Sequence, residues 1–582
     1  MKLIKKVMMV ILCTMVLAPL WGAPLLAQEL EPSIKRAPLN PAYQKFIKAR
    51  EKEEVTPFAL GAETRFTGYI PSKIDWSHLK NAQISLPGDV AASNSFTVQS
   101  ETLPARYDVR ADYVTEVKNQ EPFGNCWTYA AMAAMESNLI KKSFADQTID
   151  LSEWYLTYYA YNDESDALPG FPLQGRDPYY DQGGTDWIAA AILTRGTGPL
   201  YEGDAPTPTA AKDVYEPQVM PQRFKVKNVL YLGYAGSDEQ PLKDERTDLV
   251  KKALMQYGAL SLGIYQVAPD AYALNPDTAA YFYNDDDAEN ANHAVTIVGW
   301  DDDYAVDNFG GHYVIRNQAG EIVDEGDREV PDEPGAWIVR NSWGDDWGDG
   351  GYYYVSYEEA SIYDGIAYDV VAAAEGEMIY QHDPLGLDAF INVDGEKGDG
   401  EGPATTAYFA NVFKAERNER IHSIAFYTPM PSTAYEVQIY SGVDDMGPTS
   451  GKQVASFTGT LSVPGYNTID LPRGILIRDG ETFSVAVRVT MDYEYPIPAG
   501  DGADDERNKS WISEDGKTWI DLSSLAGGED ADDGDPLPVV CLKVFGTDAT
   551  AHHSSNCSAV SPTLIFFAAL IPLALLRRKR EE

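Results

Sequence analysis

One cysteine, one histidine and one asparagine stand in three separate motifs whose residue types fit nucleophilic catalysis. Cys126 lies in the run QEPFGNCW, directly before an apolar stretch that predicts a buried helix from Trp127 to Lys142. A thiol in the first turn of a helix has its pKa lowered by the helix dipole, so this position favours a reactive thiolate. Gln120 can offer a side-chain N–H, beside the Cys126 backbone N–H, to a developing oxyanion.

His293 and Asn341 mark the ends of two apolar runs that predict strands. His293 begins HAVTIVGW, and Asn341 follows AWIVR. A strand end is a rigid mount for a side chain, and an asparagine oxygen can accept a hydrogen bond from an imidazole and fix its tautomer. Each residue alone has an ordinary structural interpretation, because a single Cys is usually a small buried apolar residue. The three together, in this chain order, favour a Cys-His-Asn triad.

The elements that must position these residues form two regions, and the fold class we expect is α+β followed by all-β. Residues 102–372 read as helices first and strands later, which predicts a two-lobed α+β domain. Its further expected elements are helices near Trp187–Arg195 and Leu249–Tyr257, and strands at Ala259–Tyr265, His293–Trp300, Ala336–Asn341 and Tyr352–Tyr357. Residues 377–547 alternate β-forming runs with Gly, Pro and Asp turns, which predicts an antiparallel sandwich. Its expected strands are Ile421–Tyr427, Tyr435–Tyr440, Asn467–Leu471, Phe483–Val489 and Cys541–Phe545.

Both ends of the chain resemble protein-targeting signals. Residues 1–27 combine a basic start, an apolar run and a small residue, Ala27, at the expected cleavage point, which predicts a secretory signal peptide. Residues 28–101 are expected to be a propeptide or a spacer, with one helix from Leu39 to Lys52. Residues 548–582 contain a linker, a short apolar span and a basic cluster at Arg577–Arg580, which predicts retention in a membrane by the tail.

Composition excludes one class of partner and limits disulfides. The chain has 89 acidic residues against 46 Lys and Arg, a formal charge of −43, so a nucleic-acid partner is excluded by charge repulsion. Of the four cysteines, Cys13 leaves with the signal peptide, and only Cys126, Cys541 and Cys557 remain. An exported protein with so few cysteines is not a disulfide scaffold.

The catalytic motifs resemble those of the papain and cathepsin family over about residues 103–360. QEPFGNCW is similar to the segment around the family's nucleophile, where Gln stands six residues before the Cys. LPARYDVR, NHAVTIVGW and VRNSWGDDWGDGGYY resemble the mature N-terminus, the His segment and the Asn segment. DQGGTDWIAAAI resembles the segment that pairs with substrate backbone. The resemblance implies a cysteine peptidase with Cys126, His293 and Asn341 as catalytic residues, Gln120 and Cys126 at the oxyanion, and Gly183, Gly184 and Trp343 along the substrate cleft.

Several departures from the family pattern are visible, among them Asn125 directly before Cys126, where a smaller residue is usual. Phe123 stands where the family has a Cys, so the disulfide that braces the cleft is missing, and packing by Phe123 is expected to replace it. Asn292 precedes His293, where Asp is frequent. The 48 residues from His293 to Asn341 exceed the papain pattern, and we expect the insert to project as a loop near the cleft.

The C-terminal regions have resemblances of their own. YQHDPLG, NTIDLPRGILIRDGETFSVAV and SWISEDGKTWIDL resemble the lectin-like sandwich that follows papain-type domains in some bacterial proteins. Its expected partner is a cell-surface glycan or protein, and we favour core positions for Trp511 and Trp519 over a ligand platform.

The last 30 residues resemble CTERM-type bacterial sorting tails. The expected location is the cell surface, the outer membrane or the extracellular space.

The expected function is peptide-bond hydrolysis on protein or peptide substrates, without a metal or other cofactor. The acidic runs at Asp301–Asp303 and Asp345–Gly350 lack EF-hand spacing and read as loops. Two alternatives remain open. A transglutaminase-type acyltransferase also uses Cys, His and an acid in this order, and a surface protein with a degenerate catalytic domain would act through its sandwich alone.

Overall fold

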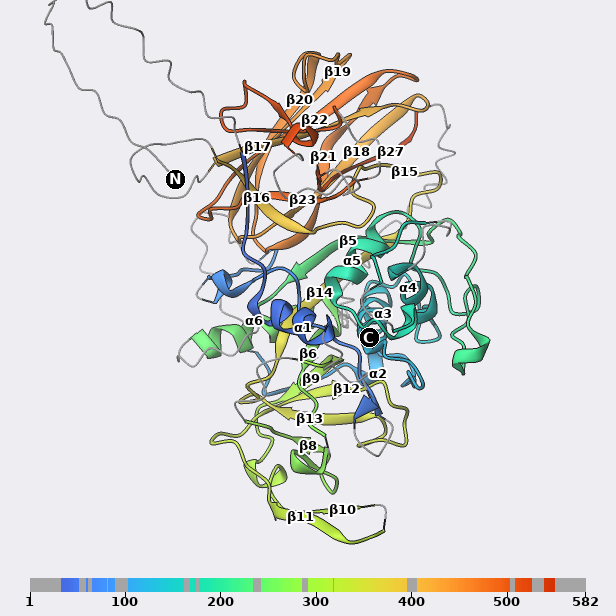
Figure 1. The fold of residues 1–582 in the computed structure, drawn as a ribbon, viewed down its shortest axis with the longest axis vertical. Coiled ribbons are helices and arrows are strands. Elements are labelled where there is room, and N and C mark those ends of the chain that lie inside the picture. The colour runs from blue at the N-terminus through green and yellow to red at the C-terminus, as the bar shows by residue number, and fades with distance from the viewer. Residues whose placement is uncertain are drawn as a thin grey trace, which may run out of the picture.

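The computed structural model divides into a C-terminal sandwich, a central domain of helices and strands, and a hairpin at the far end (Figure 1). It describes residues 33–51, 59–60, 65–80, 82–88, 103–161, 168–173, 177–233, 242–268, 270–284, 291–317, 319–394, 406–502, 508–525 and 538–549. The predicted signal peptide and the apolar and basic parts of the predicted tail lie outside these residues. Within them, no helix combines the length and the apolar character needed to cross a membrane.

The helical lobe is built around helix α3 (Cys126–Lys141), which is buried from Cys126 to Ile140. Because its side chains are apolar or small on nearly every face, it packs inside the domain rather than on its surface. Helices α4 (Glu153–Ala160) and α5 (Asp186–Thr194) surround it. Ser152 and Thr185 cap these helices by accepting hydrogen bonds from the backbone N–H groups of Tyr155 and Ile188. The short helix α2 (Arg110–Tyr113) precedes them.

The β lobe is a mostly antiparallel sheet that presents the two strand ends expected from the sequence. Its strands β6 (Leu260–Ile264), β9 (His293–Asp301), β12 (Ala336–Arg340) and β13 (Tyr352–Ser356) are consecutive neighbours. Every residue of β6 and β12 is buried. Strand β14 (Tyr363–Ala372) joins β6 to β5 (Phe224–Tyr231), and helix α6 (Leu242–Tyr257) begins seven residues before the predicted start. The smaller strands β4 (Arg106–Asp108), β7 (Leu274–Asn275) and β8 (Ala280–Tyr281) complete this sheet.

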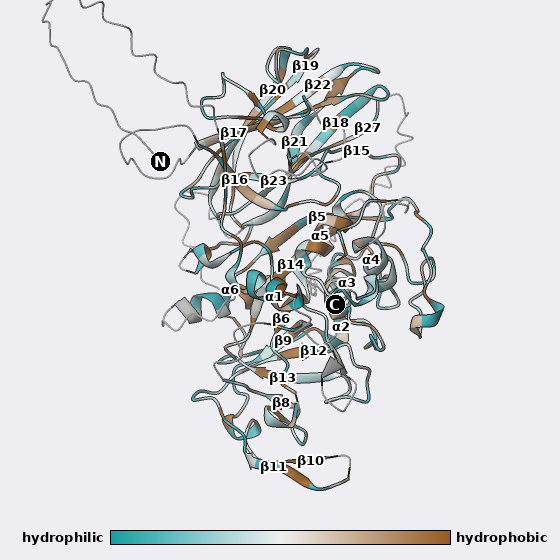
Figure 2. Ribbon diagram, viewed as in Figure 1, coloured by the Kyte–Doolittle hydropathy of each residue, from teal (hydrophilic) through white to brown (hydrophobic). Residues whose placement is uncertain are grey.

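The C-terminal region forms two facing sheets around a separate apolar core that includes Phe409, Phe426, Val437 and Val487. One sheet has β15 (Met378–Tyr380), β27 (Leu542–Asp548), β18 (Glu419–Thr428) and β21 (Gly465–Ile477). The other has β20 (Lys452–Leu461), β19 (Thr433–Ser441), β22 (Thr482–Thr490), β17 (Thr406–Lys414), β24 (Ser510–Ser513) and β25 (Ile520–Asp521). Figure 2 shows hydrophobic colours on β5 and β22, which face buried cores.

The sandwich and the β lobe share one continuous sheet. Gly465 and Tyr466 of β21 pair with Leu230 and Val229 of β5. A buried aromatic group, Trp187, Tyr231, Tyr427 and Tyr466, belongs to one apolar cluster across the junction. Main-chain pairing combined with buried aromatic area holds the two parts in a fixed arrangement.

The N-terminal segment runs from the sandwich to the cleft. Strand β1 (Ser33–Arg36) pairs antiparallel with β16 (Ala389–Asp394), which belongs to a third sheet with β23 (Ile497–Asp501) and β26 (Pro538–Val540). Helix α1 (Pro41–Glu51) follows, as expected from Leu39–Lys52, and the short strands β2 (Ala59–Leu60) and β3 (Arg65–Phe66) lead toward the catalytic residues. Arg36 and Lys73 both form ion pairs with Asp388.

The insert before Asn341 is a hairpin rather than a loop near the cleft. Its strands β10 (His312–Arg316) and β11 (Ile322–Asp327) pair with each other, outside the main sheet. Tyr272 donates to Asp324 (2.8 Å) and Arg328 donates to Ala271 O (3.0 Å), so the hairpin packs on the segment before β7. Figure 1 places it at the end of the β lobe away from α3. The expected position beside the cleft is therefore wrong, because the hairpin packs on residues 271–272 and points outward from there.

Candidate active site

Cys126, His293 and Asn341 meet where helix α3 touches the ends of β9 and β12. The imidazole Nε2 of His293 lies 2.8 Å from Asn341 Oδ1. The Sγ of Cys126 accepts a hydrogen bond of 3.2 Å from the backbone N–H of Ala294, the residue after His293. All three side chains are buried, with exposed fractions of 0 to 2%. The three predicted residues are thus brought together from positions up to 215 residues apart.

The asparagine selects one imidazole tautomer. Since Asn341 Oδ1 is an acceptor, Nε2 must carry the proton, and Nδ1 keeps a lone pair. Nδ1 is buried and has no hydrogen-bond partner among the described residues. That nitrogen is therefore the one left to exchange a proton with the thiol, as a general base requires.

Burial sets the protonation of the covered site. It raises the pKa of the Cys126 thiol to about 12, against a lowering by the backbone N–H groups of Ala294, Trp127 and Tyr69. It lowers the pKa of His293 to about 4, against a raising by the hydrogen bond with Asn341. Both pKa shifts disfavour the charged form of their group. The Cys126 thiol and the His293 imidazole are therefore both neutral while the cleft is covered.

Two tryptophans shield the His293–Asn341 hydrogen bond. The ring of Trp343 stacks on the His293 imidazole at 4.6 Å between centroids, and Trp347 meets Trp343 edge-on at 5.2 Å. Trp343 is 2% exposed, so in the covered cleft it contacts the base. Its expected contact with substrate stays a prediction.

Gln120 lies beside the nucleophile with both ends of its amide engaged. Its Oε1 accepts from Ser342 Oγ (2.6 Å), the residue after Asn341, which fixes the amide relative to the triad. Its Nε2 donates to Phe123 O (3.0 Å) and to Thr67 O (3.1 Å). The donor expected to serve an oxyanion therefore binds a carbonyl of the N-terminal segment.

Residues 67–70 lie across the cleft and pair with its predicted substrate-binding edge. Gly184 donates its N–H to Gly68 O (2.8 Å) and accepts from the N–H of Ile70 (3.1 Å). On the other wall, Gly68 and Tyr69 both donate to Asn292 O (3.3 and 3.1 Å). A Cβ at Gly184 would lie 2.3 Å from the Trp127 ring, so only glycine allows this edge to lie so close to Trp127. Neighbouring Gly183 has φ of 77°, a left-handed conformation.

A carboxylate takes part in bracing the loop before the nucleophile, where the sequence suggested Phe123 alone. Phe123 does pack, against Trp154 (5.5 Å) and Tyr180 (5.4 Å). Next to it, Asp181 accepts a hydrogen bond from the backbone N–H of Gly124 at 2.8 Å. This bond joins the nucleophile loop to the segment that carries Gly184. Sequence reasoning missed Asp181, whose only signal was its place beside the Gly-Gly pair.

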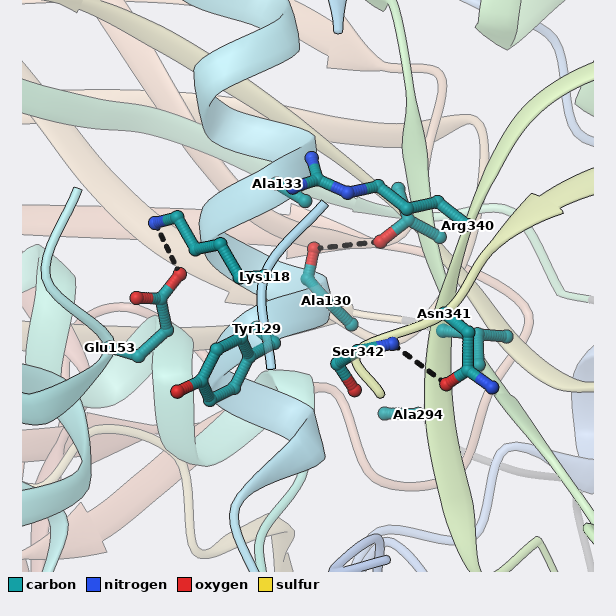
Figure 3. A pocket seen from close by; sticks show the side chains of 11 residues that line it. Lys118, Tyr129, Ala130, Ala133, Glu153, Ala294, Arg340, Asn341 and Ser342 are labelled. Carbon is teal, nitrogen blue, oxygen red and sulfur yellow. Dashed lines mark hydrogen bonds and ion pairs between the residues drawn. The ribbon is translucent and has the colours of Figure 1, made fainter. Parts of the chain in front are cut away.

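A largely buried ionic network lies near the two lobes' contact, and Figure 3 shows three of its side chains, the paired Lys118 and Glu153 and Arg340. Lys118 Nζ contacts Glu153 (2.7 Å) and Glu136 (3.3 Å). Thr115 Oγ1 donates to Glu136 (2.6 Å) and accepts from Arg340 of β12 (3.0 Å). The network connects the helical lobe to the residue preceding Asn341, so it fixes the two lobes relative to each other. Among the described residues no group of three or more His, Cys, Asp or Glu side chains is arranged to hold a metal ion.

Comparison with known proteins agrees with this geometry. Residues 103–374 match the family described as "Papain family cysteine protease", and residues 379–545 match "Lectin like domain". A cysteine protease of Blomia tropicalis is 28% identical over 258 residues, covering 44% of this chain and 61% of that protein, less than two thirds of its length.

Solved structures extend the likeness of fold to 89% of the chain. The cysteine protease and lectin-like domains of Cwp84, a surface layer associated protein of Clostridium difficile, align with a TM-score of 0.61 at 21% identity, covering 89% of this chain and 98% of that one. A variant of Cwp84 solved after propeptide cleavage aligns at 0.56 with 23% identity, over 76% and 99%. The predicted fold class, a papain-like α+β domain followed by an antiparallel β domain, is confirmed.

Proposed function

We propose that this chain, which contains a papain-family cysteine protease domain followed by a lectin-like domain, is an exported cysteine peptidase made in a latent form. One observation carries the proposal. The base His293 has its Nε2 fixed by Asn341 at 2.8 Å and its Nδ1 unpaired, beside a thiol at the start of a buried helix. The Gln120–Ser342 hydrogen bond fixes an amide donor beside the thiol, which supports the peptidase. The alternative function, a transglutaminase-type acyltransferase, has no comparable support.

The chemistry follows from the positions of these groups. Once the cleft is open, His293 Nδ1 takes the thiol proton and the Cys126 thiolate attacks the peptide carbonyl, forming the C–S bond. Gln120 Nε2 and the Cys126 N–H stabilise the oxyanion. The C–N bond breaks as His293 gives its proton to the leaving amine. Water then attacks the thioester through His293, releasing the acid and restoring the thiol.

The N-terminal segment is proposed to act as a propeptide. Two contacts support this role: Thr67 O accepts a hydrogen bond from the Gln120 amide, and Gly68 and Ile70 pair with Gly184. Substrate needs both the Gln120 amide and the Gly184 backbone. While this segment is in place, neither the oxyanion donor nor the substrate edge is free. Removal of residues 28–101 is the expected activating step.

Export and surface location rest on the two ends of the chain. The predicted signal peptide and the sorting-type tail support a protein carried to the cell surface. The similar protein Cwp84 is described as surface layer associated. The lectin-like domain is proposed to bind a surface glycan or protein. Trp511 is 9% exposed and packs with Ala410 and Ala486, so it favours the core position over a ligand platform.

The test is intact-mass spectrometry of the purified protein treated with an epoxide that alkylates activated thiols. Protein with residues 28–101 removed should gain one label, on Cys126, and Cys126→Ala and His293→Ala variants should gain none. Unprocessed protein should label slowly. A processed, folded wild-type protein that neither labels nor hydrolyses peptides would show that the protease domain is degenerate.

A further inference from the structure

The N-terminal segment supplies the outermost strand of a sheet in the C-terminal region. Strand β1 pairs with β16 along four residues, and the N–H of Ala37 extends this pairing by donating to Phe390 O at 2.8 Å. On its other side β16 pairs with β23. Within the described part of the chain, no further strand lies beyond β1 in this sheet. Removal of residues 28–101 therefore makes β16 an edge strand, whose backbone groups lose the partners that β1 provides.

The side chains at this edge include an apolar strip. Ile34 is half-buried, packs on the apolar core of the sandwich and lies opposite Val393. Arg36 lies two residues further, on the same face of β1, and is opposite Ile391. With β1 in place, Val393 and Ile391 are 8% and 1% exposed. Loss of β1 takes away the apolar side chain that packs over this strip.

A carboxylate stands at the start of the same edge. Asp388, directly before β16, forms an ion pair of 3.1 Å with Arg36 and a second one with Lys73. Its side chain is 18% exposed. Both cations belong to the N-terminal segment, so its removal takes them away together. An apolar strip that ends at a carboxylate matches an extended peptide in which a Lys or Arg follows an apolar residue two positions later.

We propose that the edge of β16 in the processed protein binds an extended basic segment of another protein, which adds as a strand in the place of β1. The inference rests on the proposed removal of residues 28–101. Main-chain hydrogen bonds supply affinity, and the positions of Ile34 and Arg36 define the apolar and the basic side chain that give specificity. The formal charge of −43 favours a basic partner and repels a second copy of this chain.

The test uses the Cys126→Ala chain, cut near residue 102 and washed until mass spectrometry shows that the N-terminal segment has left. A fluorescent peptide of residues 33–40 should bind the cut chain, measured by anisotropy, and not the uncut chain, in which β1 occupies the edge. An unrelated peptide of the same length, with valine at the position of Ile34 and lysine at that of Arg36, should also bind. Replacing that lysine with aspartate should weaken binding roughly five- to thirtyfold.

Substitutions identify the contacts. In the peptide of residues 33–40, Ile34→Ala should weaken binding roughly tenfold, because the side chain is half-buried. Ala37→Pro removes the N–H that bonds β16 and should weaken binding roughly two- to twelvefold. In the protein, Asp388→Asn should weaken binding up to roughly fivefold and should not weaken further the Arg36→Ala peptide, because both changes remove the same ion pair. Asp470→Asn, on β21, is the control and should bind like the parent chain.

Several results would overturn the inference. The N-terminal segment might never leave the cut chain, the cut chain could bind no more peptide than the uncut chain, or the lysine and aspartate peptides could bind alike. Dimers of the cut chain that exclude the peptide would assign the edge to a second copy instead. Because Cys126→Ala removes the nucleophile, none of these results depends on peptide hydrolysis, which the epoxide experiment tests separately.

Discussion

The side-chain amide of Gln120 donates a hydrogen bond of 3.1 Å to the backbone carbonyl oxygen of Thr67. The group best placed to stabilise an oxyanion is thus held by the protein's own N-terminal segment. The same segment bonds both walls of the cleft, at Asn292 and Gly184. In the proposed latent form the segment therefore occupies donors that catalysis needs, and loosening the segment is expected to expose the active site.

Gly68 is the position where the segment is easiest to loosen. Its φ is +145°, and a Cβ there would lie 2.1 Å from Gly124 O, an impossible contact. Gly68→Ala should favour the open cleft by about 1–3 kcal/mol, the usual cost of forcing an extra carbon into a packed contact. The measurement is epoxide labelling of unprocessed protein, which should rise roughly 5- to 150-fold.

Gly88→Ala is the matched control for this prediction. Gly88 also belongs to the N-terminal region and has positive φ, +102°, but a Cβ there meets nothing within 4 Å. It shares the backbone strain without the clash on Gly124. If both variants label alike, strain rather than contact with the nucleophile loop controls opening.

Acid should also favour opening, through His293. Burial holds its pKa at about 4, below the ordinary 6.5. Between these pH values an opened site binds a proton that the covered site does not, so the covered form loses stability as pH falls from 6.5 to 4. The full effect is about 3 kcal/mol. Above pH 6.5 this residue contributes no pH dependence.

The measurement is hydrogen exchange at residues 67–70 in the Cys126→Ala protein between pH 7 and 4, corrected for intrinsic exchange. The Cys126→Ala, His293→Gln double variant is the control, because every other titrating group is the same in both proteins. The acid-dependent increase in opening should be larger with His293 than without it. Equal pH profiles would assign acid opening to other groups.

The three residues that meet at the candidate active site were predictable because each one is marked by its own local sequence. Cys126 precedes an apolar helix, and His293 and Asn341 bound apolar runs, so element type and chain order suffice. The contacts of Asp181 with Gly124 and of Tyr69 with Gly263 join distant segments and leave no local pattern. The four-residue strand β1 was missed for the same reason, since its pairing with β16 spans more than 350 residues.

Asp181 is expected to position the nucleophile loop. Asp181→Ala leaves the Gly124 N–H without its acceptor, which costs about 1–3 kcal/mol for a buried donor. We expect a lower melting temperature and a lower kcat, with a smaller change in KM, because the loop carries Cys126 rather than the substrate edge. Steady-state kinetics of the processed protein measures both constants.

Asp181→Asn separates geometry from charge in the same experiment. The asparagine oxygen can still accept from Gly124 at 2.8 Å, so this variant should stay close to wild type. An Asn variant as impaired as the Ala variant would show that the negative charge, and not the hydrogen bond, matters at this position.

Asp388 should control how long the N-terminal segment stays on the sandwich after cleavage. It forms ion pairs with Arg36 and Lys73, on either side of helix α1. Their side chains are 56% and 40% exposed, so each pair is worth at most about 1 kcal/mol. Asp388→Asn should therefore speed release only roughly two- to thirtyfold, measured as the rate at which epoxide labelling appears after the chain is cut near residue 102.

Asp470→Asn, which breaks the Lys227 ion pair between the sandwich and β5, should leave that rate unchanged. If Asp388→Asn also leaves the release rate unchanged, then β1 pairing and the cleft contacts alone retain the segment. In that case hydration of the separated charges offsets the loss of the ion pairs at Asp388.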